Sequence, residues 1–210
     1  MFLSAPLLIA ASVAQWSPLV VAGAVLPAVL PIFVIKPNLA VAIHSAKPSL
    51  RTVPVTLIFT AVSFLILPSW VGDWLTALRD HYNPIPLLVI PFGPLLLLSA
   101  LACRHPARRL LLVMALMPQT PYFYDQLPLW LIPRTSRQGF ILSVSSWDTY
   151  WDWRWFDGQE QMGAAVNAAQ PWIVALIYLP ALGIVFWQEY DAWRAKRRSP
   201  SPGTEAYGGA

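Results

Sequence analysis

The sequence contains few charged residues. Asp, Glu, Lys and Arg make up 11% of its 210 residues, whereas an ordinary soluble domain has about a quarter. So few charges cannot cover the surface of a soluble globule of this size, and 57% of the residues are hydrophobic. The composition therefore excludes a soluble enzyme and a disordered chain, and it predicts a polytopic, all-α membrane protein.

Cysteine and histidine are also scarce. The single Cys103 excludes an internal disulfide. Three scattered histidines and one cysteine match no zinc-ligand spacing, so we expect neither a metal site nor a cofactor. The net charge is +4, but the basic residues flank apolar runs. This pattern is typical of membrane orientation, and we expect no nucleic-acid partner.

Long uncharged runs predict the membrane segments, because a span needs roughly 20 apolar residues. The first run, 1–35, is predicted to form one helix at about 2–14 and a second from Trp16. Further spans are expected within 52–72, 82–103 and 171–187. We expect about 6–8 membrane segments in a transmembrane domain over 1–190. Residues 191–210 are expected to form a basic cytoplasmic segment and then a disordered tail.

The stretch between Leu110 and Trp151 is less regular. Prolines divide it into apolar pieces that are each too short to span a membrane. Each proline removes an amide donor and disfavours an unbroken helix. Two interpretations stay open, either broken or re-entrant helices that line a cavity, or ordinary kinked helices.

Lysine and arginine are distributed unevenly along the chain. An alternating path places most of the 14 basic residues on one side of the membrane. The positive-inside rule makes this side cytoplasmic, with both termini on it, in the inner or plasma membrane of the cell. The residues assigned to this side are Lys47, Arg51, Arg104, Arg108, Arg109, Arg134, Arg137, Arg194, Lys196, Arg197 and Arg198.

Lys36 and Asp125 are the charged residues whose positions suggest chemistry. Lys36 ends the longest uncharged run and precedes Pro37. It is either a lysine that snorkels to the interface or a cation that holds a phosphate at a proline break. Asp125 is the only acid between Leu110 and Pro133. A carboxylate in a membrane usually has a basic partner, and Lys36 and His44 are both candidates. A purely structural role for Asp125, locking a helix break, is the alternative.

A third candidate is the aromatic and acidic stretch 147–160, WDTYWDWRWFDGQE. Stacking rings beside carboxylates are typical of carbohydrate sites, and Trp151, Asp152 and Trp153 are the predicted sugar-binding residues. The alternative is an amphipathic segment that anchors the protein at the membrane interface.

Short motifs in this order resemble the C-terminal half of glycosyltransferase family 87. These are polyprenyl-phosphate-dependent mannosyltransferases of the GT-C membrane class. Gln15-Trp16-Ser17-Pro18-Leu19 resembles the family's Gly-Gln-x-x-x-Leu segment, with Ala14 in place of the glycine. The Lys36-Pro37-Asn38-Leu39 segment is similar to its Lys-Pro-(Gln/Asn/His)-Leu segment. Pro121-Tyr122 through Tyr124-Asp125-Gln126-Leu127 resembles its Pro…Tyr-Asp-x-x-Leu segment, and Trp74 resembles the Trp that opens an outer loop.

The resemblance implies transfer of a hexose, mannose above all, from a polyprenyl-phosphate donor at the external face. It implies that Lys36, Asn38 and His44 bind the donor phosphate. The residues implied to shape the site are Gln15, Gln119, Tyr122, Tyr124 and Asp125. The family's first external loop, which carries its general base, has no counterpart in this sequence. We therefore expect the chain to be incomplete as a catalyst on its own.

The expected partners follow from this interpretation. They are membrane lipids, the polyprenyl-phosphate donor, and an N-terminal half or another membrane subunit. The main alternative is a non-enzymatic subunit that packs in a larger membrane complex, because small residues such as those at 22–24 allow close helix packing. A transporter half is a weaker alternative, because the sequence shows no internal repeat.

Overall fold

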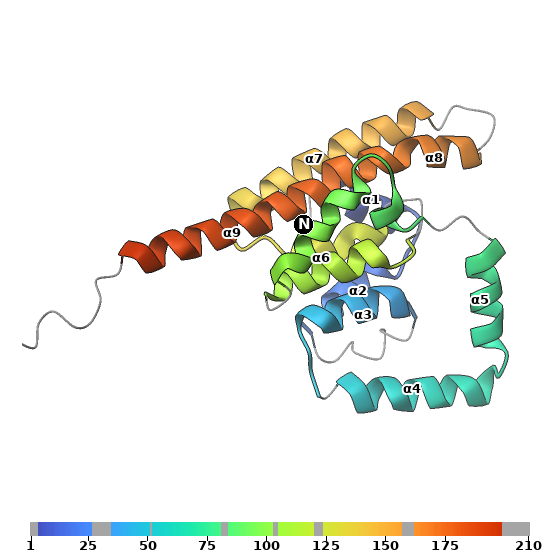
Figure 1. The fold of residues 1–210 in the computed structure, drawn as a ribbon. Helices are drawn as coiled ribbons and strands as arrows, with labels where there is room; N and C mark the ends of the chain where they lie inside the picture. The colour runs from blue at the N-terminus through green and yellow to red at the C-terminus, as the bar shows by residue number, and fades with distance from the viewer. Residues whose placement is uncertain are drawn as a thin grey trace, which may run out of the picture.

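The computed structural model describes residues 4–26, 35–50, 52–80, 84–102, 105–119, 124–156 and 162–198. Every regular element within these ranges is a helix, which confirms the all-α prediction. The α-helices are α1 (Ala5–Ser12), α2 (Ser17–Gly23), α3 (Pro37–Ala46), α4 (Thr52–Ile66), α5 (Trp70–Asp80), α6 (Pro106–Leu116), α7 (Ser136–Phe156), α8 (Met162–Ile173) and α9 (Leu179–Arg198). Three 3-10 segments, η2 (Pro86–Leu88), η3 (Gly93–Ala102) and η4 (Tyr124–Leu131), and one π turn, η5 (Val174–Tyr178), complete the fold (Figure 1).

Proline determines where several helices begin. Pro6, Pro18, Pro37 and Pro106 lie at the first or second position of α1, α2, α3 and α6. This position suits proline, because the amide that it lacks would have no partner within the helix.

One helix is long and apolar enough to span a membrane. It runs continuously over Ala168–Arg198, through α8, η5 and α9, and it contains the predicted span 171–187. Two bent pairs pass the same test, α1 with α2 at 119° and α4 with α5 at 97°, which gives up to three spans in the described residues. The structure therefore supports a membrane protein, and the expected number of 6–8 segments stays a prediction.

Two of the expected spans have another form. The run 52–72 is not one helix, because the chain turns by 97° between Ile66 and Trp70, where Pro68 interrupts the backbone. The described part of 82–103 forms the short segments η2 and η3, because its prolines remove the amide donors that a regular α-helix needs. Between Leu110 and Trp151 the chain forms α6, η4 and α7, which are separate, broken helices.

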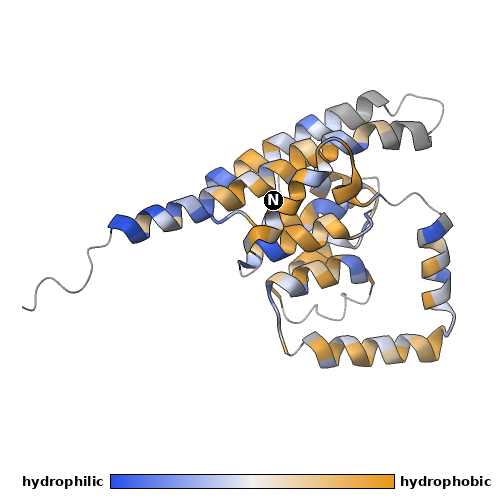
Figure 2. Ribbon diagram, in the orientation of Figure 1, coloured by the Kyte–Doolittle hydropathy of each residue, from blue (hydrophilic) through white to orange (hydrophobic). Residues whose placement is uncertain are grey.

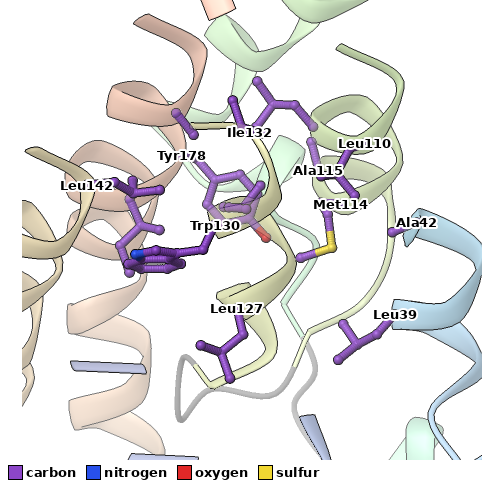
Figure 3. Close-up of a cluster of buried hydrophobic side chains, with 14 of the residues drawn as sticks. Leu39, Ala42, Leu110, Met114, Ala115, Leu127, Trp130, Ile132, Leu142 and Tyr178 are labelled. Atoms are coloured by element: carbon purple, nitrogen blue, oxygen red, sulfur yellow. The ribbon is translucent and has the colours of Figure 1, made fainter. Parts of the chain in front are cut away.

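The buried core joins segments that are far apart in sequence. Leu39 and Ala42 of α3 face Met114 and Ala115 of α6 (Figure 3). The indole of Trp130 in η4 points toward α7, where its N–H donates to Ser143 Oγ at 3.1 Å. The helices α4 and α5 project from this bundle (Figure 1). Their apolar side chains are exposed, with Leu65 at 84%. Such a surface is suited to lipid or to another membrane segment.

Basic residues from distant segments lie at one end of the bundle. Arg108 forms a two-pronged ion pair with Glu189 of α9, and Arg109 Nε donates to Ser45 O near the end of α3 at 2.6 Å. Arg134 Nη2 lies 2.8 Å from His105 Nε2, and the Arg137 guanidinium lies over the Trp187 ring. The last turns of α9 continue from this end and are strongly hydrophilic (Figure 2). We call this region the basic end.

Candidate functional site

The central polar feature of the bundle is a cluster formed by Ser17, Lys36, Tyr124 and Asp125, here called the Lys36 cluster. Lys36 Nζ lies 2.7 Å from Asp125 Oδ1 and 2.8 Å from Ser17 Oγ. The Ser17 hydroxyl donates to the same carboxylate oxygen at 3.2 Å. The ammonium also lies 4.5 Å from the centre of the Tyr124 ring, within the range of a cation–π contact.

The cluster forms where three helical segments begin. Lys36 caps α3 with a non-helical backbone, as expected for a residue that precedes a proline. Ser17 is the first residue of α2, and Asp125 lies in the first turn of η4. The amino ends of helices carry partial positive charge, which together with Lys36 stabilises the carboxylate of Asp125.

Of the two candidate bases, Lys36 and His44, it is Lys36 that forms the ion pair with Asp125. Lys36 forms the salt bridge although 89 residues separate the two, and His44 does not take part. His44 lies eight residues further along α3, about 12 Å along the helix axis. There it lines a separate groove of about 380 Å³ between α3 and α4. The structure therefore does not bring His44 to the predicted phosphate site.

Burial limits the chemistry that this cluster can perform. The side chain of Asp125 is 2% exposed and that of Lys36 is 17% exposed. Removing two charges from water costs several kcal/mol per ion, so a buried pair is retained only with good geometry and additional hydrogen bonds. Asp125 is paired and enclosed, and this does not suit a general base. Lys36 reaches the surface and can bind an anion.

The neighbouring polar residues link α3 and η4 to the end of α6 and to the residues that follow it, Pro118 and Gln119. Gln126 Nε2 donates to Gln119 Oε1 at 2.8 Å, and Gln119 Nε2 donates to Met114 O at 2.8 Å. Asn38 Nδ2 donates to Pro118 O at 3.3 Å, so it links α3 to this segment. Asn38 and Gln119 therefore support the backbone beside the Lys36 cluster, and neither contacts the Lys36 ammonium.

The other predicted residues are distributed as follows. Gln15 lies in the turn between α1 and α2, where its backbone N–H donates to Ala10 O at 2.8 Å. Tyr122 lies outside the described residues. Trp151 is 65% exposed on α7, with its ring edge-to-face against Tyr150 at 5.5 Å. Asp152 and Trp153 belong to the same helix, and their side chains lie outside the described part of the chain.

The sequence did not identify two polar residues at or beside the Lys36 cluster. Ser17 occurs in an apolar stretch, and nothing in the sequence relates its hydroxyl to Lys36 or Asp125. Gln126 follows Asp125 directly, and an amide within an apolar region is the signal that could have identified it. In the described ranges, no group of three His, Cys, Asp or Glu side chains could hold a metal ion.

No family model, no curated protein and no solved structure matches the chain. The chemistry of the site is therefore inferred from its own geometry and from the motifs that converge on it.

Proposed function

We propose that this chain is part of a membrane glycosyltransferase that takes its sugar from a polyprenyl-phosphate donor, with Lys36 contacting the donor phosphate. The proposal rests on the positions of the three segments that resemble the family motifs, around Gln15, Lys36 and Asp125. These segments meet in one cluster, although Ser17 and Asp125 are 108 residues apart in the sequence.

The backbone at Ala14 adds support. Ala14 adopts φ 51°, in the left-handed region that favours glycine. The family motif has glycine at the corresponding position, immediately before the glutamine. A glycine at this position would adopt this conformation without strain, and this supports the proposed resemblance.

The chemistry assigned to Lys36 is binding and orientation. An ammonium has three N–H donors, and in the described structure Asp125 and Ser17 each accept one from Lys36. The third donor is suited to a phosphate oxygen at the exposed edge of the side chain. Asp125 holds the Lys36 side chain in position through the ion pair, and the general base would come from outside this chain.

The proposed topology places the basic end in the cytoplasm and the Lys36 cluster in the opposite half of the membrane. Lys36 and Ser45 lie at opposite ends of α3, and Ser45 contacts Arg109 at the basic end. Nine residues of helix separate them by about 14 Å. Mannose is the proposed sugar, transferred at the external face, in a bundle of 6–8 membrane segments.

The test is mannose transfer from polyprenyl-phosphate mannose in native membranes that contain the full chain and its partners. Lys36→Met/Asp125→Asn removes the cation and its counter-charge together, so that no buried charge is left without a partner. We expect this variant to lose transfer, whereas Lys47→Met, an exposed lysine at the end of α3, keeps it. Unchanged transfer in the Lys36 variant would reject the proposal.

The exposed apolar residues of α4 favour a second function, that of a non-enzymatic membrane subunit. Leu57, Ile58 and Leu65 are each at least 60% exposed. A partner helix would cover these residues. Cross-linking from a photoreactive residue at position 58 in native membranes should then capture a defined polypeptide, whereas cross-links to lipid alone would exclude this function.

A further inference from the structure

The helix that runs over Ala168–Arg198 is longer than the membrane core that it would cross. Its 31 residues extend about 46 Å, whereas the hydrocarbon core of a bilayer is about 30 Å thick. Glu189 still contacts the bundle through its ion pair with Arg108, and every side chain from 190 to 198 is exposed. Residues 190–198, here called the α9 extension, project from the bundle (Figure 1). This end of the helix is therefore exposed to the lipid headgroups or to the water beyond them.

Exposed aromatic side chains lie near both ends of the helix. Trp172 is 43% exposed near the start, and Tyr190 and Trp193 are 56% and 49% exposed near the other end. Tryptophan and tyrosine favour the two interfaces of a membrane. Trp172 and Trp193 are 21 positions apart along the helix, which corresponds to about 31 Å and matches the thickness of the hydrocarbon core. With Trp172 at one interface, Trp193 lies at the other, and the residues after it lie in the headgroup layer.

The α9 extension is strongly basic and hydrophilic (Figure 2). It contains four basic residues and one acid, which gives a net charge of +3. The basic residues all follow Trp193, and they are Arg194, Lys196, Arg197 and Arg198. Lysine and arginine next to a spanning helix attract anionic lipids, by about a fivefold increase in the binding constant for each residue. The positive charge therefore lies at the depth of the lipid phosphates.

Two of the arginines share a face of the helix with the exposed rings. The Arg197 guanidinium lies 4.1 Å from the centre of the Trp193 ring, and this ring stacks on that of Tyr190 at 5.9 Å. Arg194 is four residues after Tyr190, so it lies on the same face. A guanidinium over a ring keeps the N–H donors at its edge, and these donors match the oxygens of a phosphate. The face therefore combines an apolar surface for the interface with donors for a lipid phosphate.

We propose that the α9 extension binds anionic phospholipids of the membrane. Tyr190 and Trp193 lie at the interface, and Arg194 and Arg197 contact the lipid phosphates. Depth and charge together select this occupant, because an anionic headgroup is the anion found at the level that Trp193 marks. The proposal requires α9 to cross a membrane. It does not depend on the proposed glycosyltransferase function, because the α9 extension and the Lys36 cluster share no residue.

The experiment uses the full chain in vesicles that contain phosphatidylglycerol and phosphatidylcholine in equal parts, with identical acyl chains. A photoreactive residue replaces Ala195, which is exposed between Arg194 and Lys196, and mass spectrometry identifies the lipids that it captures. We expect captured phosphatidylglycerol to exceed captured phosphatidylcholine at least fivefold. Added salt should lower this ratio toward one, because it screens the attraction between the charges.

Two double variants test the residues assigned to the phosphates. Arg194→Gln/Arg197→Gln removes two exposed charges from the face, and we expect it to lower the captured ratio about fivefold. The matched control, Lys47→Gln/Arg79→Gln, removes two exposed charges from the end of α3 and the last turn of α5, and it should leave the ratio unchanged. All four side chains are exposed, so both variants should fold.

Four outcomes would overturn the proposal. Equal capture of the two lipids would remove the role of the headgroup charge, and equal effects of the two double variants would indicate diffuse attraction to the whole protein. Capture of a polypeptide at position 195 would show that the α9 extension is a protein interface. Capture of neither lipid would show that the α9 extension lies in water beyond the headgroups.

Discussion

Replacing Lys36 with methionine keeps a side chain of similar length but removes the ammonium, and we expect it to destabilise the fold by about 3–5 kcal/mol. The reason is the burial of Asp125, whose side chain is 2% exposed. Without Lys36, the buried carboxylate would lose its counter-charge, and the Ser17 hydroxyl is a neutral partner that does not replace it. Removing one partner of a buried ion pair costs an amount of this order.

The converse variant should cost less. Asp125→Asn leaves the Lys36 ammonium 17% exposed, beside the Ser17 hydroxyl and over the Tyr124 ring. Partial contact with water and these neighbours reduce the penalty, which we expect to be about 1–3 kcal/mol. The double variant contains no buried charge, so it should be more stable than Lys36→Met alone.

The assay is thermal unfolding in detergent, followed by tryptophan fluorescence. For a chain of this length a change of 1 kcal/mol shifts Tm by about 2–4 °C, so Lys36→Met should lower Tm by about 6–20 °C. Lys47→Met is the control for removal of an exposed lysine. If the two single effects simply added in the double variant, within about 0.5 kcal/mol, Lys36 and Asp125 would not be coupled and the reasoning would be refuted.

Three further variants test local features of the fold. Ala14→Gly should raise stability by up to about 1 kcal/mol in the same assay, because Ala14 has φ 51°, and a lower Tm would contradict this. Gly93→Ala should destabilise by about 1–3 kcal/mol or more, because its Cβ would lie 2.4 Å from Pro86 O, and an unchanged Tm would contradict that clash. Burial and the neighbouring Arg134 lower the pKa of His105, which lies outside the candidate spans. The folded state therefore favours the neutral ring, so stability should fall as pH drops below about 6.5 and level off below the folded-state pKa. His105→Gln should remove this part of the pH dependence, and an identical pH profile in the variant would contradict the assignment.

Composition and hydrophobic runs predicted the general character of the fold. They gave the all-α class, the apolar segment 171–187 within the long helix, and the break between α1 and α2 near Trp16. These features depend on local sequence, because charge content, run length and proline act within one segment. The contacts at the basic end bring Arg108, Arg109 and Arg134 to one region of the fold, and the side of the membrane on which they lie stays a prediction.

The sequence could not predict features that depend on tertiary contacts. Both Lys36 and His44 were possible partners of Asp125, and only the packing of α3 beside η4 separates them. The role of Ser17 depends on a turn centred on Ala14, whose backbone conformation is unusual for alanine. The run 82–103 was predicted as a span from its hydrophobicity, but backbone geometry at its prolines determined its form.

The most direct test of the central claim is donor binding by the purified chain, measured by titration with a short-chain polyprenyl-phosphate mannose. We predict that Asp125→Asn and Lys47→Met bind the donor, because both keep the Lys36 ammonium. The variant Lys36→Met/Asp125→Asn, folded but without the cation, should not bind it. Equal donor binding by the double variant and the unmodified chain would contradict the assignment of Lys36 to the donor phosphate.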